Sequence, residues 1–221
     1  MWRTSSAPRA PAAGRPRALR SGLRLSPGMK VGLYGGSFNP AHEGHSHVAR
    51  TALRRLGLNR VVWLVSPQNP LKAPNGTPPL EQRMRSARHK AAGPSMIVTG
   101  LEQVLGSQFT IDTVRALKAR CRGARFVWIM GADNLATFHH WRGWIGIMRE
   151  LPVAIVARPG ASMRARHSPA AMRFRSRRLP ESAARTLALR TPPAWIYLTA
   201  PLNPASSTAV RNSPDQPGHS W

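Results

Sequence analysis

The sequence predicts an α/β fold in a single domain, built on a doubly wound parallel sheet that is flanked by helices. Short apolar segments rich in β-branched residues recur along the chain, and amphipathic stretches lie between them. Several of the apolar segments do not alternate with polar residues, which is typical of strands that helices cover on both faces. A length of 221 residues suits one domain with a sizeable core.

Six segments are predicted as strands because they are short, apolar and rich in residues that favour extended backbone. These strands are expected at 30–35, 60–65, 95–100, 126–131, 153–158 and 195–200. Helices between parallel strands produce right-handed crossovers, so the carboxyl ends of the strands meet at one edge of the sheet. We therefore expect a ligand crevice at that edge.

Two of the connecting segments show a clear helical pattern. In residues 43–56 the apolar side chains fall on one stripe at helical spacing, namely Val48, Ala49, Ala52, Leu53 and Leu56. Residues 110–120 show the same pattern with Ile111, Val114 and Leu117. Both segments are predicted to pack one face against the sheet.

Composition divides the chain into three parts. Residues 1–28 are basic, contain no acid and are rich in proline, alanine, glycine and serine, so we expect an extension outside the core. Organelle transit peptides share this composition. Residues 29–213 hold all the predicted strands and form the predicted globular domain, and residues 214–221 are a short tail. Because the first strand starts directly after Met29, we expect a chain that begins there to fold and function.

The net charge of +25 is concentrated in residues 1–28 and 161–190. The second stretch is expected to be a solvated loop or an irregular helix. Outside these stretches the charge is ordinary, which favours small anionic ligands over nucleic acid as partners. Cys121 has no second cysteine to pair with, which suits a reducing compartment, and no apolar run approaches the ~18 residues that span a bilayer. We expect a cytoplasmic protein with no membrane partner.

The segment GGSFNPAHEGH, residues 35–45, follows the first predicted strand and opens the first predicted helix. Backbone N–H groups and a helix N-terminus at this place favour anions. Glycines would let a phosphate approach the main chain, and His42 and His45 could donate to its oxygens and gain charge in the transition state. His47 is expected to face outward. A metal site formed by these three histidines is not expected, because no cysteine or carboxylate pattern completes one.

This segment resembles the G-x-F-[DN]-P-x-H-x-G-H signature of the nucleotidyltransferase superfamily, and ASSTAVR at 205–211 resembles its second signature, I-S-S-T-x-[IV]-R. Four intervening segments resemble bacterial nicotinate-nucleotide adenylyltransferase in order: SPQNPLK at 66–72, GSQFTIDTVRAL at 106–117, WIMGADNLATFHHWRGWIGI at 128–147 and VARPG at 156–160. The resemblance implies a Rossmann-like fold. It also implies transfer of the adenylyl group of ATP to nicotinate mononucleotide with Mg²⁺, giving deamido-NAD and pyrophosphate.

The resemblance also implies roles for individual residues. The catalytic residues would be His42, His45 and Arg211, which bind phosphate oxygens. The other residues expected to bind ATP are Gly35, Gly36, Ser37, Phe38, Lys72, Gly131, Asp133, Ser206, Ser207 and Thr208. Asp133 would accept hydrogen bonds from ribose hydroxyls, unless it caps the helix that follows it. The Mg²⁺ ion would be held mainly by the phosphates of ATP, with no dedicated protein ligands.

Nicotinate mononucleotide would be bound by Ser107, Thr110, Phe138 and Trp141. An aromatic ring at Phe138 or Trp141 would stack on the pyridine ring. Backbone N–H groups near Ser107 and Thr110 would meet the nicotinate carboxylate, and Phe109 replaces the tyrosine that the family has between them.

Two alternatives stay open at this point. The protein could be a related adenylyl- or cytidylyltransferase that acts on another phosphate acceptor, such as phosphopantetheine. It could also be a non-catalytic relative that binds nucleic acid, as its net charge of +25 would favour. The sequence is compatible with a monomer or a homodimer.

Overall fold

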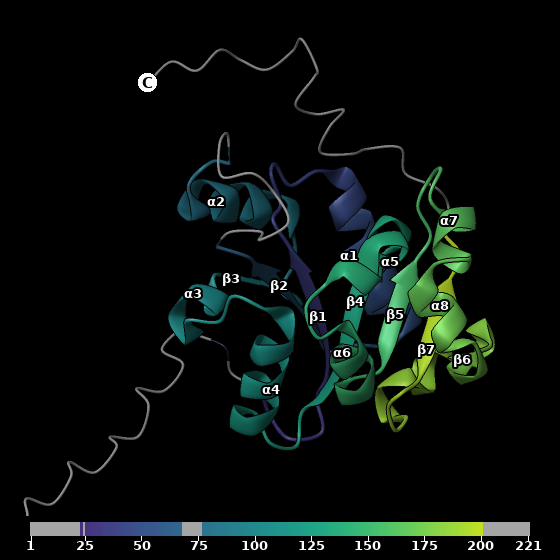
Figure 1. Ribbon diagram of the computed structural model, residues 1–221. Helices are drawn as coiled ribbons and strands as arrows, with labels where there is room; N and C mark the ends of the chain where they lie inside the picture. The colour runs from purple at the N-terminus through teal and green to yellow at the C-terminus, as the bar shows by residue number, and fades with distance from the viewer. Residues whose placement is uncertain (1–22, 24, 68–76, 201–221) are drawn as a thin grey trace, which may run out of the picture.

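A parallel sheet lies at the centre of the computed structural model, which describes residue 23, residues 25–67 and residues 77–200 (Figure 1). Its strands are β1 (Lys30–Gly36), β2 (Arg60–Val65), β3 (Met96–Thr99), β4 (Arg125–Gly131), β5 (Val153–Val156), β6 (Arg178–Leu179) and β7 (Trp195–Leu198). Their order is β3-β2-β1-β4-β5-β7-β6, and every neighbouring pair is parallel. The chain winds outward in both directions from β1 and β4, so the predicted doubly wound sheet is confirmed.

The six predicted strands correspond to β1, β2, β3, β4, β5 and β7. The strand β6 was not predicted, because two residues are too few to show a pattern. It extends the sheet by pairing Arg178 with Trp195 and Leu179 with Ile196.

Helices connect the strands, and the two predicted ones are confirmed as α1 (Glu43–Arg55) and α4 (Thr110–Arg120). The other α-helices are α2 (Leu80–Lys90), α3 (Leu101–Leu105), α5 (Ala132–Thr137), α6 (Trp144–Glu150), α7 (Ser162–Arg166) and α8 (Pro169–Arg173). Three 3₁₀ helices complete the described chain, η1 (Phe138–His140), η2 (Arg175–Arg177) and η3 (Glu181–Leu189). None of the helices in the described ranges is long and apolar enough to cross a bilayer.

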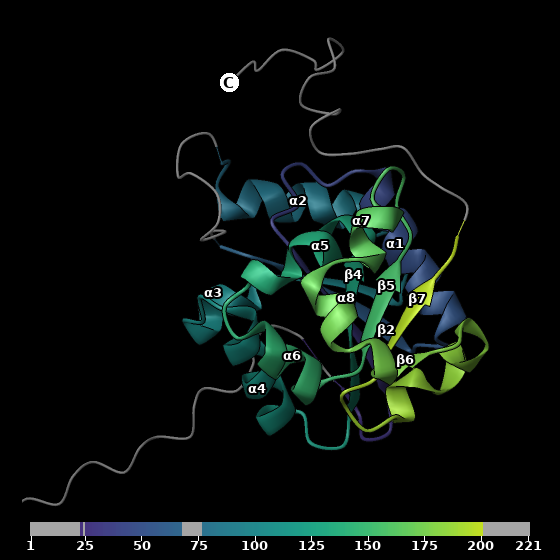
Figure 2. The same ribbon diagram turned by 45° about the vertical axis from the view of Figure 1, so that its right-hand side comes forward.

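The sheet is covered on both faces, as the continuous apolar strands predict. On one face the strands pack against α1, α2 and η3, and on the other against α4, α5, α6, α7 and α8. In Figures 1 and 2, α5 and α6 lie on the opposite side of the sheet from α1. Trp63 and Trp128 are fully buried on opposite faces, which shows why these strands carry bulky apolar residues throughout.

The arginine-rich stretch 161–190 is part of the helical layers, so it is an irregular helical segment and not a solvated loop. Several of its apolar side chains are buried in the core clusters, among them Ala165, Ala170, Ala184 and Leu187. Its arginines are exposed. The arginines of this stretch therefore lie on the surface of the protein, and its apolar side chains pack in the core.

The residues that precede β1 also contribute to the core. The side chain of Leu23 is only 7% exposed and belongs to the apolar cluster that contains α4 and α6. The N–H of Gly28 donates to the carbonyl of Gly123 at 2.8 Å. Part of the predicted extension therefore packs on the domain, which argues against a start at Met29 without loss of stability.

Shortening Leu23 to alanine should lower the free energy of unfolding by about 2 kcal/mol, because a buried leucine side chain is lost from the core. A chain that begins at Met29 should show a similar loss. Urea denaturation measures both. Leu25→Ala is the matched control, since Leu25 is only partly buried and should cost less. Equal stability of the full chain and the chain starting at Met29 would show that Leu23 contributes nothing.

Candidate active site

The candidate site lies at the carboxyl edge of the sheet, where the winding direction reverses between β1 and β4. The strand β1 ends at Gly36, β4 ends at Gly131, and Arg158 follows β5 by two residues. Ligands of doubly wound sheets bind at this switch point. The predicted site residues that the structure describes are grouped around it in two places, one at α1 and one at α4.

The glycine turn is shaped by packing as well as by access for a ligand. A Cβ atom on Gly35 would lie 2.6 Å from Cη2 of Trp128, and one on Gly36 would lie 3.1 Å from the ring of Phe38. Phe38 has a positive φ of 46° and its ring is buried, so its side chain is unable to reach ATP. The ring lies edge-on to His45 with centroids 5.0 Å apart, and it therefore supports that imidazole.

His42 and His45 cap the N-terminus of α1 with their side chains. The Nδ1 atom of His42 accepts the N–H of Gly44 at 3.1 Å, and Nδ1 of His45 accepts the N–H of His42 at 3.2 Å. A nitrogen that accepts carries no proton, so these bonds assign the proton of each neutral ring to Nε2. The ring centroids lie 3.8 Å apart. The helix terminus thus carries two adjacent Nε2–H donors.

Burial keeps His42 neutral. Its residue is only 4% exposed, and desolvation, followed by the charge of Arg158, lowers its pKa from 6.5 to about 4. Asp133 and Glu43 act in the opposite direction without reversing the effect. The expectation that His42 gains charge in the transition state is therefore not favoured, and the ring is suited to act as a neutral hydrogen-bond donor.

An arginine that the sequence reasoning did not assign to the site lies beside these histidines. Arg158 forms an ion pair with Asp133, with Nε 3.7 Å from Oδ1, and hydrogen-bonds to the hydroxyl of Tyr34. The absence of a side chain at Gly131 makes room for this pair, since a Cβ there would clash with Asp133. The VARPG segment contained the signal, because a basic residue just beyond a central strand faces the crevice.

Asp133 does not cap the helix that follows it. The N-cap of α5 is Gly131, and the helix has no side-chain cap. The carboxylate of Asp133 pairs with Arg158 instead, and its side chain is 52% exposed. Because half of this side chain is exposed, the carboxylate can still make the predicted contact with ribose hydroxyls.

The second group of predicted residues lies at the loop between α3 and α4. Ser107 uses its polar groups internally: its N–H donates to the carbonyl of Glu102 at 3.0 Å, and its hydroxyl lies 2.7 Å from Oγ1 of Thr113. Thr110 is the first residue of α4, a position whose N–H has no acceptor within the helix. Of the two predicted contacts to a carboxylate, the geometry therefore favours Thr110.

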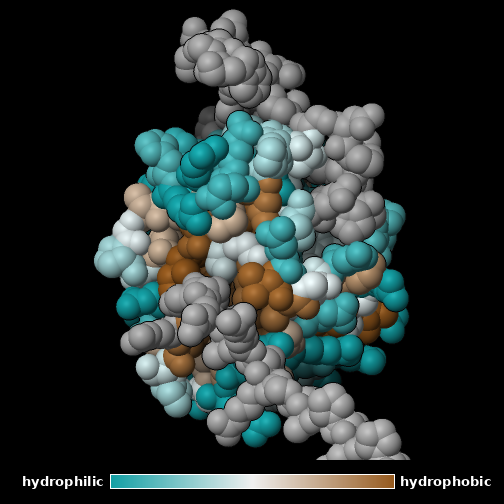
Figure 3. All heavy atoms as spheres, turned by 90° about the vertical axis from the view of Figure 1, so that its left-hand side faces the viewer, coloured by the Kyte–Doolittle hydropathy of each residue, from teal (hydrophilic) through white to brown (hydrophobic). Residues whose placement is uncertain are grey.

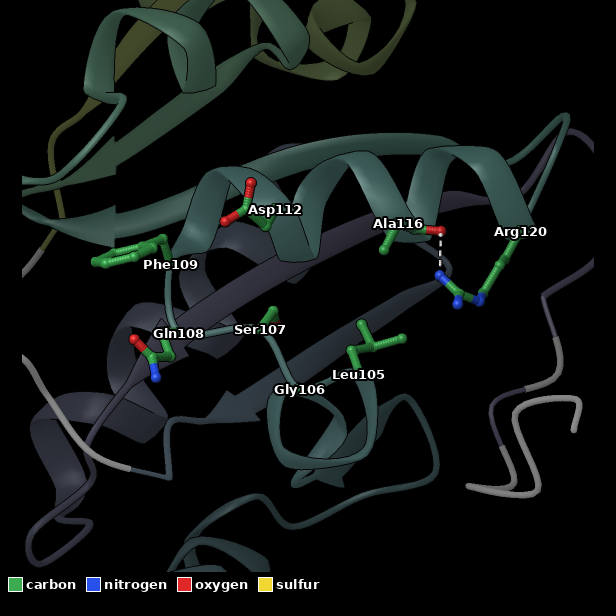
Figure 4. A pocket seen from close by; sticks show the side chains of 8 residues that line it. All are labelled: Leu105, Gly106, Ser107, Gln108, Phe109, Asp112, Ala116 and Arg120. Atoms are coloured by element: carbon green, nitrogen blue, oxygen red, sulfur yellow. Dashed lines mark hydrogen bonds between the residues drawn. The ribbon is translucent and has the colours of Figure 1, made fainter. Parts of the chain in front are cut away.

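A cavity of about 450 Å³ opens beside this loop (Figure 4). It is lined by Leu105, Gly106, Ser107, Gln108, Phe109, Asp112, Ala116 and Arg120. The guanidinium of Arg142 lies 4.4 Å above the ring of Phe109 and brings a positive charge to the loop. On the same side of the molecule, apolar residues gather across the middle of the surface (Figure 3), and Val104 of α3 is 70% exposed.

Of the two predicted stacking residues, only Trp141 offers a ring surface. Phe138 is fully buried and lies edge-on to Trp141 and Trp144, with centroids 5.4 Å and 6.1 Å away. Trp141 is half-buried and is held edge-on by Trp128 at 6.3 Å. Phe138 therefore fixes the orientation of Trp141 and is unable to stack on a ligand itself.

Five predicted residues lie outside the described ranges, so their roles stay predictions: Lys72, Ser206, Ser207, Thr208 and Arg211. The prediction that His47 faces outward is wrong, because it is half-buried and its Nε2 atom is buried without a hydrogen-bond partner. Within the described residues no group of three or more His, Cys, Asp or Glu could hold a metal ion.

The buried His42 should make stability depend on pH. Between pH 6.5 and 4 the unfolded chain binds a proton at His42 that the folded chain excludes, so stability present above pH 6.5 is lost as the pH falls, by at most about 3 kcal/mol. Denaturation at several pH values measures this. Asparagine can also cap a helix but does not titrate, so His42→Asn should lose less stability than the original protein over this range. An identical pH profile for the two proteins would contradict the assignment.

Comparison with known proteins places the chain among its relatives. The cytidylyltransferase-like family model matches residues 33–213. A probable nicotinate-nucleotide adenylyltransferase of Caulobacter sp. (strain K31) is 64% identical over 83% of this chain and 97% of its own length. One of Cereibacter sphaeroides (strain ATCC 17023) is 52% identical over 83% of this chain and 96% of its own.

A solved structure shares the fold. Nicotinic acid mononucleotide adenylyltransferase of Plasmodium falciparum, in complex with APC, matches with a TM-score of 0.60 and 16% identity, covering 83% of this chain and 82% of that one. The family model spans both groups of site residues, and the relatives are similar over most of their own length. The chain therefore belongs to the cytidylyltransferase-like family and, within it, to the nicotinate-nucleotide adenylyltransferases.

Proposed function

We propose that this protein transfers the adenylyl group of ATP to nicotinate mononucleotide and releases pyrophosphate, giving deamido-NAD. The observation that carries the proposal is the pair of histidines at the start of α1. Their Nδ1 atoms accept backbone N–H groups, so each neutral ring carries its proton on Nε2, from which it is proposed to donate to phosphate oxygens. Arg158 adds a positive charge beside them. These are the groups that an anionic transition state requires.

The reaction needs little more than positioning and charge stabilisation. The phosphate of nicotinate mononucleotide is already ionised, so it can attack the α-phosphorus of ATP without a protein base. The bond from that phosphorus to the leaving pyrophosphate breaks on the opposite side. The histidines, Arg158 and the backbone of residues 36–38 would hold the ATP phosphates in this geometry. Lys72 and Arg211 are proposed to contact the same phosphates.

The metal in this proposal is Mg²⁺ bound to ATP. Near the turn, Asp133 supplies a carboxylate beside Arg158. Mg²⁺ commonly keeps substrate phosphates and water as ligands. When bound, the ion would neutralise charge on the phosphates, while the protein side chains orient them.

The acceptor end of the site favours a planar, anionic ring. Trp141 is held edge-on by Phe138 and Trp128, so its exposed surface has a fixed orientation for stacking. The N–H of Thr110 at the start of α4 and the guanidinium of Arg142 are proposed to attract the nicotinate carboxylate. Phosphopantetheine has no aromatic ring that could use Trp141, so it is the weaker candidate acceptor.

The proposed activity is tested with the purified protein, ATP and Mg²⁺ and one acceptor at a time, with pyrophosphate release as the measurement. Nicotinate mononucleotide should be the preferred acceptor over nicotinamide mononucleotide and phosphopantetheine. His45→Ala should lower turnover by more than about tenfold, because one phosphate donor is lost. His89→Ala is the matched control, since His89 is exposed on α2. Salt-dependent nucleic-acid binding without pyrophosphate release would favour the non-catalytic alternative.

Replacing Trp141 with leucine should raise the KM for nicotinate mononucleotide roughly fivefold, because a stacking surface is lost. The KM for ATP should change little. Trp141→Phe keeps an aromatic ring and should lie between the two. Steady-state kinetics with each substrate varied in turn measure the effect, and an equal rise in both KM values would indicate a general loss of structure instead.

A further inference from the structure

A buried arginine in α2 has no part in the proposed chemistry. Arg83 is 2% exposed, and its guanidinium donates to backbone carbonyls. Its Nε donates to Pro78 at 2.9 Å and its Nη2 to Pro67 at 2.7 Å. Its Nη1 donates to both Ser37 at 2.8 Å and Ser66 at 2.7 Å. Three separate segments of backbone are thus held by one guanidinium.

These carbonyls lie on loops at the carboxyl edge of the sheet. Ser37 belongs to the phosphate-binding turn, Ser66 and Pro67 follow β2, and Pro78 precedes α2. A planar guanidinium presents its donors in fixed directions, so it fixes the three segments relative to one another. None of the ion pairs among the described residues includes Arg83. Within the described part of the chain, its charge is compensated by the dipoles of these peptide carbonyls.

A buried acid holds the acceptor loop in a similar way. Glu102 of α3 is 5% exposed, and its carboxyl group hydrogen-bonds to the hydroxyl groups of Ser66 and Thr113. Thr113 is fully buried, and its Oγ1 lies 2.7 Å from Oγ of Ser107. The backbone carbonyl of Glu102 also accepts the N–H of Ser107 at 3.0 Å. Glu102 therefore fixes the loop that leads to Thr110.

Ser66 connects the hydrogen bonds of Arg83 with those of Glu102. Its carbonyl accepts from Arg83, its hydroxyl bonds to Glu102, and its N–H donates to the carbonyl of Gly36 at 3.0 Å. A chain of buried and partly buried hydrogen bonds therefore connects Ser37 in the phosphate-binding turn to Ser107 in the acceptor loop, the link from Oγ1 of Thr113 to Glu102 being 3.5 Å long. The two substrate sites share one internal support.

We propose that Arg83 and Glu102 are positioning residues for adenylyl transfer, which act through Ser66 to hold the phosphate-binding turn and the acceptor loop at a fixed separation. The inference rests on the proposed function, because an in-line attack requires the two phosphates to be aligned. A displacement of about 1 Å can cost about a hundredfold in rate. Neither side chain needs to touch a substrate for this role.

Buried charges of this kind are an inefficient way to stabilise a fold. Arg83 and Glu102 each lose hydration, which raises the pKa of Glu102 and lowers that of Arg83. Apolar side chains of similar size often stabilise a core as well or better. The directed hydrogen bonds that these residues make are what an apolar side chain is unable to replace.

The test uses the full chain and starts by measuring the product that the original protein forms from ATP and nicotinate mononucleotide. Arg83→Met, Arg83→Lys, Ser66→Ala, Glu102→Ala and the double variant Arg83→Met/Glu102→Ala are then compared for kcat and for both KM values. Arg85→Met and Gln103→Ala are the matched controls, since both residues are exposed on the same helices. Urea denaturation records stability in parallel.

Arg83→Met should lower kcat about tenfold or more and raise the KM for ATP. Arg83→Lys should restore part of both losses. Glu102→Ala should chiefly raise the KM for the acceptor. Ser66→Ala removes only a hydroxyl and should lower kcat severalfold with little loss of stability. In the double variant the loss of kcat/KM should be smaller than the product of the two single losses, because both changes break one connection.

Kinetics of Ser66→Ala equal to those of the original protein, or single losses that multiply in the double variant, would overturn the inference. If Arg83→Met does not fold, Arg83→Lys replaces it in the same cycle. Failure of the proposed function would be seen separately, as absence of deamido-NAD formation by the original protein. If that protein uses another acceptor, the same cycle is carried out with it.

Discussion

The hydrogen bond from the N–H of Gly44 to Nδ1 of His42 sets the chemistry of the site. It satisfies a backbone donor at the start of α1, and it also forces the proton of the imidazole onto Nε2. His45 repeats the arrangement with the N–H of His42. The same two imidazoles thus form the helix cap and the proposed pair of phosphate donors, and both lie in the short interval between β1 and α1.

Packing under this cap explains why the turn has its composition. Phe38 fills the space below His45 and contacts Tyr34 and Trp63, with ring centroids 5.4 Å and 5.0 Å away. Gly35 leaves room for the ring of Trp128 from the neighbouring strand. Glycines in such turns are readily attributed to ligand access alone. Here Gly35 is required by the contact between β1 and β4, because a side chain would clash with Trp128. The packing of the core therefore restricts which residues the turn can contain.

The strands of the sheet and the position of the candidate site could be predicted from the sequence. Which side chains face the site could not. The strands could be predicted because buried parallel strands are continuously apolar, and α1 and α4 because their stripes are regular. Two short elements, β6 and η1, have too few residues to show periodicity. Phe38 and Phe138 were placed among the ligand contacts by motif, but both are buried. Arg83 was missed because a single arginine within a helix of a chain with 33 basic residues carries no local signal, and Arg158 because its place just beyond β5 was not used.

Those two arginines differ in a way that decides what each can do. Arg83 directs its donors to carbonyls at 2.7–2.9 Å, so binding a phosphate would require it to abandon the loops it holds. Arg158 lies 3.7 Å from Asp133, a separation at which attraction persists but no short hydrogen bond is made. Arg158 also bonds to the hydroxyl of Tyr34 and lies beside His42. Arg83 therefore supports the backbone of the site, whereas Arg158 brings its charge to the proposed phosphate-binding groups.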